Sequence, residues 1–316
     1  MKRENIFFLL SLFFLFLLFF IINYYSKDVL NKTSNLFFLK QTDSSLLRPL
    51  SKEKIADLYL NSNNFLSVFF NLDENKEIVL AEKKSSEVIP IASLTKLMTA
   101  VVSLENYNLD DLVDISSFAV STNGTMGGLK VNEKITVRDL LYVTLIESSN
   151  DGAEALAEKM GRTEFIYRMN KKASEIGMTN TRFYNPTGLD IFTDDSAKEL
   201  LETNVSTPED LEKLVVYILK NQSLIPQILS LSEKKIVSSS GVVHNLENTN
   251  ILLKENAGYL WGKTGYTKEA NGCIILILNN YSAVNSGYII NVITGADDRF
   301  KEARKLEEWL HTSFIW

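Results

Sequence analysis

A serine and a lysine three positions apart, Ser93 and Lys96, are the first groups in this sequence that could carry out chemistry. Periodicity predicts a helix over Leu94 to Leu104 that begins at Ser93, so the lysine would lie one turn beyond the serine on the same face. A lysine there could activate the serine as a nucleophile, and the helix N-terminus would direct free amides at negative charge that develops beside it. The spacing alone is weak evidence, because residues 51–54 and 232–235 share it.

Two other short sequences place polar groups at predicted element boundaries. Ser148-Ser149-Asn150 lies at the junction between two predicted helices. Lys263-Thr264-Gly265 lies in a predicted strand and occurs once in the chain. Each also has an ordinary structural interpretation, in which the first serine caps a helix and the lysine is solvated on an edge strand.

The elements that would position these groups change in type along the chain. Hydrophobic periodicity and turn signals predict strands near both ends of the body and helices between them. Cap signatures mark helix starts at Thr136 and at Pro208. The order predicts an α/β (α+β) fold in which both ends of the domain form an antiparallel sheet of five strands, with a helical lobe inserted. The predicted strands are Phe65 to Leu72, Glu77 to Glu82, Gly262 to Thr267, Gly272 to Asn280 and Gly287 to Thr294, and the predicted helices include Leu140 to Ile146, Thr163 to Ile176, Glu209 to Lys220 and Arg299 to His311.

Taken together and in this order, the three short sequences resemble the Ser-x-x-Lys, Ser-x-Asn and Lys-Thr-Gly motifs of penicillin-binding proteins and serine β-lactamases. Over roughly residues 60 to 316 the chain closely resembles the low-molecular-mass D-alanyl-D-alanine carboxypeptidases. The resemblance implies a β-lactamase/transpeptidase-like fold. The stretches that carry it are Ile91 to Ala100, Glu147 to Asp151, Asn185 to Leu189 and Gly262 to Thr267.

The resemblance implies three catalytic residues. Ser93 would be the nucleophile that becomes acylated, Lys96 would take its proton, and Ser148 would relay a proton to the nitrogen of the leaving D-alanine. An amine is a base only when it is neutral, so the pKa of Lys96 must fall from about 10.4 toward 7 or 8. Lys263, close to the nucleophile in this family, would supply part of that shift.

The resemblance also implies four substrate-binding residues. Asn150 would hydrogen-bond the amide backbone of the substrate, while Lys263 and Thr264 would hold its terminal carboxylate. The backbone amides of Ser93 and Tyr266 would form the oxyanion hole.

The implied reaction is removal of the terminal D-alanine from peptidoglycan stem peptides through a Ser93 acyl-enzyme that water hydrolyses. No metal or organic cofactor would be required, and β-lactam antibiotics would act as acylating inhibitors. A D,D-endopeptidase that cuts cross-links remains an alternative, because its catalytic residues are the same. A β-lactamase is less favoured, since no counterpart of the class A deacylating glutamate is found. A wall-binding protein without turnover is a further alternative.

An apolar run over residues 6–22, interrupted only by Ser11, predicts a membrane segment. Seventeen helical residues span about 25 Å, and no small-residue cleavage site follows, which favours an uncleaved anchor over a signal peptide. Lys2 and Arg3 predict a cytoplasmic N-terminus and a catalytic domain on the extracytoplasmic side of the cell membrane, or secretion if the segment is cleaved. The predicted organisation is an anchor over residues 1–25, a stalk over 26–60 and a catalytic domain over 61–316.

Composition restricts the remaining classes of function. The chain has 316 residues with 33 basic and 39 acidic side chains, and this acidic balance makes nucleic acid an unfavourable partner. One cysteine and two histidines make a zinc site improbable. We predict that Cys273 is buried packing and that His244 and His311 take no part in the mechanism.

Overall fold

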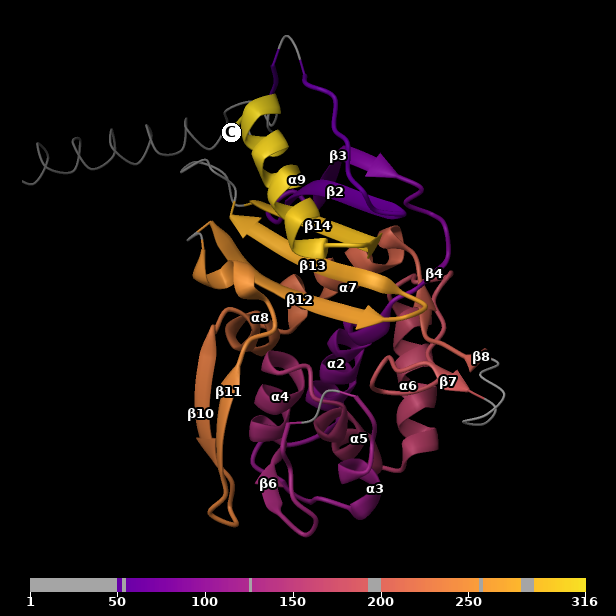
Figure 1. Ribbon diagram of the computed structural model, residues 1–316, viewed down its shortest axis with the longest axis vertical. Coiled ribbons are helices and arrows are strands. Elements are labelled where there is room, and N and C mark those ends of the chain that lie inside the picture. Colours follow the sequence, from indigo (N-terminus) through magenta and orange to yellow (C-terminus); the bar gives the residue numbers. More distant parts are fainter. Residues whose placement is uncertain (1–49, 53–54, 125–126, 193–199, 256–257, 280–286) are drawn as a thin grey trace, which may run out of the picture. The chain divides into compact units, whose positions relative to one another are not determined.

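The central element of the computed structural model is an antiparallel sheet of five strands in the order β12-β13-β14-β2-β3. Strand β14 pairs with β2, so the two ends of the body meet in the middle of the sheet. This arrangement confirms the predicted fold class (Figure 1). The strands are β2 (Asn64–Asn71), β3 (Lys76–Lys83), β12 (Tyr259–Thr267), β13 (Asn271–Asn279) and β14 (Gly287–Ala296).

The structure describes residues 50–52, 55–124, 127–192, 200–255, 258–279 and 287–316. The predicted membrane segment at residues 6–22 and most of the predicted stalk lie outside these ranges. Within them, no helix combines the length and apolar character needed to cross a bilayer.

Both faces of the sheet are covered, which explains why its inner strands are almost continuously apolar. Helix α9 (Arg299–Ser313) packs against β13 and β14 on one face, where Leu306 and Leu310 are buried. Helices α7 (Pro208–Asn221) and α8 (Leu224–Leu229) contact strands of the sheet from the helical lobe (Figure 1). Strand β13 is buried from Gly272 to Leu278, as expected for a strand between two layers.

The inserted lobe carries the remaining helices, and its predicted caps are confirmed. Thr136 Oγ1 accepts the amide of Asp139 at 3.1 Å, and Thr207 Oγ1 accepts the amide of Asp210 at 3.1 Å, directly before Pro208. Each cap satisfies a donor that the first helical turn leaves free. The helices are α2 (Lys96–Asn106), α3 (Ser117–Val120), α4 (Val137–Ile146), α5 (Asn150–Glu158) and α6 (Arg162–Glu175), with 3₁₀ turns η2 (Ala92–Thr95) and η3 (Ile251–Lys254).

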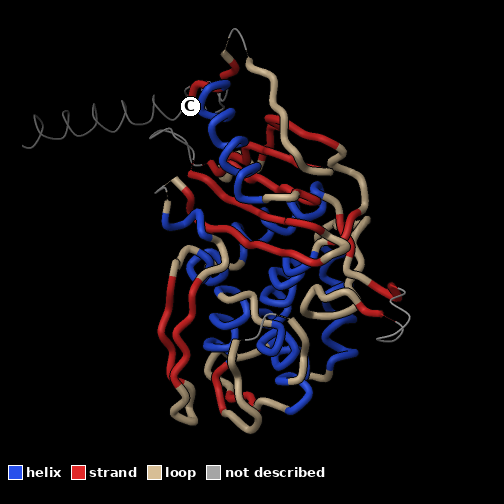
Figure 2. The backbone as a smooth tube through the Cα atoms, viewed as in Figure 1, coloured by secondary structure: helices blue, strands red, loops and turns tan. Residues whose placement is uncertain are grey.

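Short strand pairs brace the lobe, and one of them is held by a histidine. Figure 2 shows a long two-stranded hairpin, residues 233–247, beside the helices of the lobe. His244 in this hairpin is buried, and its Nε2 lies 2.7 Å from Glu133 Oε1, which joins the hairpin to the turn before residue 134. Cys273 is also buried, as predicted, and burial raises the pKa of its thiol to about 11. The pairs are β4 (Ile89–Pro90) with β9 (Val205–Ser206), β5 (Leu112–Asp114) with β6 (Lys134–Thr136), β7 (Ile191–Phe192) with β8 (Leu200–Glu202), and β10 (Glu233–Val237) with β11 (Val243–Glu247).

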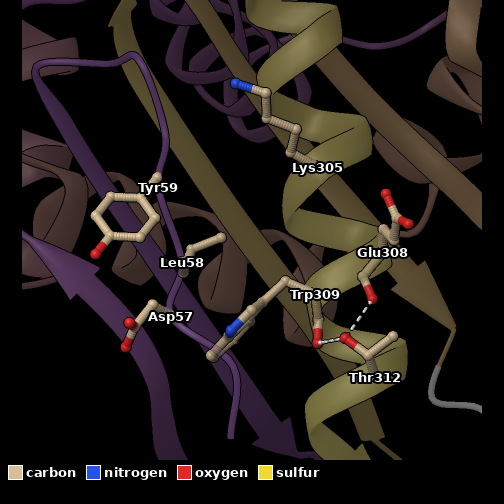
Figure 3. A pocket seen from close by; sticks show the side chains of 7 residues that line it. All are labelled: Asp57, Leu58, Tyr59, Lys305, Glu308, Trp309 and Thr312. Carbon is tan, nitrogen blue, oxygen red and sulfur yellow. Dashed lines mark hydrogen bonds between the residues drawn. The ribbon is translucent and has the colours of Figure 1, made fainter.

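The residues before β2 run along the C-terminal helix. Strand β1 (Leu50–Ser51) pairs with β15 (Phe314–Ile315), and Trp309 Nε1 donates to the carbonyl of Ala56 at 2.6 Å. A pocket of about 330 Å³ lies between residues 57–59 and α9. Figure 3 shows the side chains that line it. The last part of the predicted stalk therefore contacts α9, while the domain boundary at residue 60 stays a prediction.

A buried glutamate on α7 gives an expected pH dependence of stability. Glu212 is 5% exposed, and burial and the nearby Glu77 carboxylate raise its pKa to about 8. The unfolded chain binds fewer protons than the folded one between about pH 4.5 and 8, so stability falls as pH rises through this window. We expect Glu212→Gln to remove this fall and to raise the free energy of unfolding at pH 7 by on the order of 2 to 3 kcal/mol.

Urea unfolding at pH 5 and pH 8 measures this effect. The gain in the Glu212→Gln variant should be several times larger at pH 8 than at pH 5. Glu269→Gln, at an exposed site, is the control for the loss of one carboxylate. An equal gain at both pH values would contradict the assignment of the cost to ionisation of Glu212.

Candidate active site

The turn that carries Ser93 is held tightly against strand β12. Ser93 lies in η2, and the α-helix begins only at Lys96, so the expectation that Ser93 starts the helix is wrong by one 3₁₀ turn. The residue before it, Ala92, has φ 45°, which turns the chain out of strand geometry. A Cβ added to Gly265 would lie 3.0 Å from the Ser93 amide nitrogen, so the glycine of Lys-Thr-Gly permits the close approach of strand and turn.

Lys96 is fully buried, and its ammonium nitrogen joins three parts of the site. Nζ donates to Ser93 Oγ at 2.9 Å, to Asn150 Oδ1 at 2.7 Å and to the Thr187 carbonyl at 2.7 Å. A base within hydrogen-bond reach of a hydroxyl is the arrangement that general base catalysis requires. The predicted pairing of Ser93 with Lys96 is thus present in the structure.

Burial lowers the pKa of both lysines in the site. The pKa of Lys96 falls to about 7, although the carboxylates of Glu154 and Asp151 oppose the shift. The pKa of Lys263 falls well below its ordinary value because of burial and because Lys96 and Arg299 are near. The repulsion between the two ammonium groups lowers the pKa of Lys263, whereas burial is the cause that lowers the pKa of Lys96. The predicted contribution of Lys263 to the shift of Lys96 therefore stays a prediction. A lowered pKa lets Lys96 be neutral, as a general base must be.

Ser148 pairs with the second lysine. Lys263 Nζ donates to Ser148 Oγ at 2.7 Å and to the Thr264 carbonyl at 2.8 Å. The serine backbone has φ 61°, a conformation that costs a non-glycine residue energy and is kept where the surroundings enforce it. Because its oxygen accepts from Lys263, the hydroxyl keeps its own proton for donation.

The middle residue of Ser148-Ser149-Asn150 is the helix cap. Ser149 Oγ accepts the amide of Gly152 at 2.9 Å, so the capping role that could have belonged to Ser148 falls to its neighbour. The buried carboxylate of Asp151 also pairs with Ser149 Oγ and accepts the amide of Gly127 at 2.8 Å. These contacts leave Ser148 and Asn150 directed at the site.

Asn150 is occupied at both ends of its side chain. Its Oδ1 accepts from Lys96, and its Nδ2 donates to the carbonyl of Asn123 at 2.8 Å. A substrate amide of the kind expected here would use the remaining hydrogen of the Asn150 NH₂ group or replace the Asn123 carbonyl.

A hydrogen-bond network around Thr187 positions the site, and the sequence motifs assigned it no role. Asn185 Oδ1 accepts the amides of Thr187 at 3.1 Å and Gly188 at 2.7 Å, which turns the Thr187 carbonyl toward Lys96. Asn204 Nδ2 donates to Asn185 O at 2.8 Å and to Thr95 Oγ1 at 3.0 Å. The Asn-Pro-Thr-Gly stretch is one of the segments on which the family resemblance rests, so the sequence offered a reason to look for a role there. Asn204 belongs to no motif, and nothing in the sequence indicated its role.

The other predicted binding residues lie along β12. Thr264 Oγ1 is 2.7 Å from Thr249 Oγ1, and Tyr266 is 60% exposed at the end of the strand. Arg299, at the start of α9, was not predicted, yet its charge reaches Lys263 and Tyr266. Its buried Nε has no hydrogen-bond partner among the described residues. A carboxylate bound beside Lys263 would therefore meet a second cation.

An open groove of about 720 Å³ leads to this site. Its walls come from α3 and the loop that follows it, from α5 and α6, from residues 185–192 and from the end of β12. Most of the lining is apolar, and Tyr266, Thr187 and Asn123 connect it to the reacting groups. A mostly apolar groove with a few polar groups is the usual form of a ligand-binding site.

The comparison with known proteins agrees with this geometry. The family described as D-alanyl-D-alanine carboxypeptidase, peptidase S11, matches residues 67–297. A D-alanyl-D-alanine endopeptidase of Pseudomonas aeruginosa is 33% identical over 77% of this chain and 76% of its own length. The carboxypeptidase DacF of Bacillus subtilis is 35% identical over 62% of this chain and 49% of its own.

A solved structure extends the likeness to three dimensions. A penicillin-binding protein of Listeria monocytogenes, in its cefotaxime-bound form, superposes with a TM-score of 0.65 and 28% identity. The match covers 80% of this chain and 98% of that one.

The fold and the Ser/Lys site together define a serine hydrolase of the penicillin-binding-protein class with the transpeptidase fold. The chain belongs to the D-alanyl-D-alanine carboxypeptidase family, peptidase S11. The predicted family and enzyme class are therefore confirmed. The role of each side chain in turnover stays a prediction, now with a geometry to support it.

Proposed function

We propose that the protein removes the terminal D-alanine from peptidoglycan stem peptides through an acyl-enzyme on Ser93. The observation that carries this proposal is the Lys96 amine, 2.9 Å from Ser93 Oγ, with its pKa lowered by burial to about 7. A pKa near 7 lets Lys96 act as a free base at neutral pH and so activate the serine.

In the proposed reaction Ser93 Oγ attacks the carbonyl carbon of the penultimate D-alanine while Lys96 takes the hydroxyl proton. The backbone amides of Ser93 and Tyr266 stabilise the oxyanion. The C–N bond breaks as Ser148 donates its proton to the leaving nitrogen and takes in its place the proton that Lys96 received from Ser93, so D-alanine departs and Lys96 is neutral again. Water then attacks the ester carbonyl and gives one proton to Lys96. The ester C–O bond breaks, Lys96 returns this proton to Ser93 Oγ, and the shortened peptide leaves as an acid.

The leaving residue carries a carboxylate, and the site offers cations to receive it. Lys263 lies in strand β12, and Arg299, the first residue of α9, is near enough for its charge to lower the pKa of Lys263. An incoming carboxylate would raise the pKa of Lys263 again and so favour its charged form. Selection of a free C-terminus follows from this pairing.

A second candidate, cleavage of D-alanyl cross-links, has a specific observation in its favour. The Pseudomonas aeruginosa relative, which aligns over most of this chain, is named an endopeptidase. The groove is open, so a branched substrate is compatible with it.

Incubation with a pentapeptide and with a cross-linked dimer tests the two candidates. We expect release of one D-alanine from the pentapeptide with a kcat/KM at least about tenfold above that for dimer cleavage. Products are identified by mass spectrometry, and the Ser93→Ala variant is the blank. Faster cleavage of the dimer would replace the carboxypeptidase proposal by the endopeptidase one, and no cleavage of either substrate would reject both.

Two further proposals concern partners and location. β-Lactams should acylate Ser93, since a structural relative is known in a cefotaxime-bound form. We also propose that residues 6–22 anchor the chain in the cytoplasmic membrane with the catalytic domain on the outer side, where peptidoglycan lies; the apolar sequence supports this. Membrane fractionation of cells that express the full chain or a variant without residues 1–25 tests the anchor. The full chain should be in the membrane fraction and the variant should not, and the same distribution of both proteins would contradict the proposal.

A further inference from the structure

A buried carboxylate lines the substrate groove without belonging to any of the three motifs. Glu154 lies on α5, four residues after Asn150, and is 4% exposed. Its Oε2 accepts from Arg162 Nε at 3.1 Å, and both residues line the groove. A carboxylate buried to this extent is costly unless cations compensate for it. Arg162 and the charge of Lys96 supply part of that compensation.

The groove around this carboxylate is apolar. Phe118 and Phe192 are 53% and 43% exposed, and with Leu189 they contribute apolar surface to the groove. A ligand group that fits must offer methylenes to these walls and a positive end to Glu154. An aliphatic side chain that ends in a primary amine has both features.

The position of Glu154 relative to Ser93 indicates which substrate residue would reach it. Asn150 contacts Lys96, which contacts Ser93, and Glu154 lies about 6 Å further along the axis of α5. One extended residue spans about 3.5 Å, so the residue before the D-alanyl pair would lie beside this helix. The side chain of this substrate residue would contact the Glu154 carboxylate, whereas the atoms of the scissile bond would not.

We propose that Glu154 is a specificity residue that binds the side-chain amine of the residue preceding the D-alanyl pair. Arg162 acts as a positioning residue that holds the carboxylate in the groove. The proposal rests on the proposed function and names the part of the stem peptide that the enzyme reads: a diamino acid whose side-chain amine is free. A stem whose amine is already acylated would be a poor substrate.

Another carboxylate in the groove provides a matched comparison. Asp190 also lines it, but its Oδ1 accepts from Thr203 Oγ1 at 2.7 Å and it lies on the loop before β7, less buried than Glu154. Lys268 also lines the groove, but it is a cation and would repel an amine. Glu154 is therefore the favoured partner.

The test uses two peptides that differ only in whether the side-chain amine is free or acetylated. We expect wild-type kcat/KM to be about 10- to 100-fold higher for the free amine, the range for a hydrogen bond to a charged group. Glu154→Gln should bring the ratio of the two kcat/KM values close to one by slowing the free-amine peptide. Because Glu154 also affects the pKa of Lys96, both peptides are compared over the full pH profile, where a shift would act on them equally.

Glu158→Gln is the matched control, one turn further along α5, where the carboxylate accepts from Ser116 Oγ at 2.6 Å. It should keep the wild-type ratio, and Arg162→Gln should lower the ratio in part. An unchanged ratio in Glu154→Gln, or a ratio lost in Asp190→Asn instead, would overturn the subsite while leaving the proposed function intact. Failure of the wild type to cleave either peptide would reject the proposed function and the subsite with it.

Discussion

The Ser93→Ala variant is expected to lose hydrolysis of the D-alanyl-D-alanine bond by a factor of at least about 10⁴ and to lose all covalent labelling by penicillin. The reason is that no other hydroxyl in the described site takes its place: Ser148 accepts from Lys263, and Ser149 caps a helix. Loss of a nucleophile leaves only binding and oxyanion stabilisation, which explains the size of the effect. Turnover of a pentapeptide and labelling with a fluorescent penicillin measure it.

The chain contains its own control for this experiment. Ser232 precedes Lys235 by the same three positions, but Ser232 lies directly before strand β10 and Lys235 within it, not at the start of a helix. Ser232→Ala should leave labelling unchanged. Penicillin labelling that persists in Ser93→Ala would show that the acylated residue has been misassigned.

Replacement of Lys96 by glutamine is expected to lower the acylation rate by about 10³-fold and to remove its dependence on pH near neutrality. A general base contributes about 10² to 10⁴ in rate, and Lys96 is the group that contacts the hydroxyl. With a pKa of about 7, the wild-type rate should rise about tenfold per unit below pH 7 and level off above it. Stopped-flow acylation by a chromogenic β-lactam between pH 5 and 9 measures both effects.

Stability separates loss of the base from loss of the fold. The pKa of Lys96 falls from 10.5 to about 7 on burial, so the unfolded chain binds more protons between these values and wild-type stability decreases as pH falls through this range. The glutamine variant lacks this cost, although Asn150 and the Thr187 carbonyl lose their ammonium donor. A Tm close to that of the wild type together with a slow, pH-independent rate is the expected result. A wild-type rate profile that persists in the variant would reject Lys96 as the base.

Much of this arrangement was predictable because local patterns reflect local physics. Thr136 and Pro208 marked helix starts through capping chemistry, and alternating or continuous apolar runs marked the strands. The helix predicted over Leu94 to Leu104 lies at Lys96–Asn106 in the structure. A 3₁₀ turn precedes it, where strand β12 lies close to the Ser93 amide. Contacts from distant parts of the chain decide such details, and periodicity does not record them.

By itself the sequence determined the class of chemistry: a serine with a lysine at helical spacing, a second serine with an asparagine, and a single Lys-Thr-Gly. Only the tertiary structure decided how these groups are tuned. Complete burial lowers the pKa of Lys96. Asn185 and Asn204 hold the Thr187 carbonyl toward this lysine. Arg299, which is distant in the sequence, lowers the pKa of Lys263. The pKa of an amine depends on its solvation and on charges within a few ångströms, and both are set by residues that the fold, rather than the order of the chain, brings near.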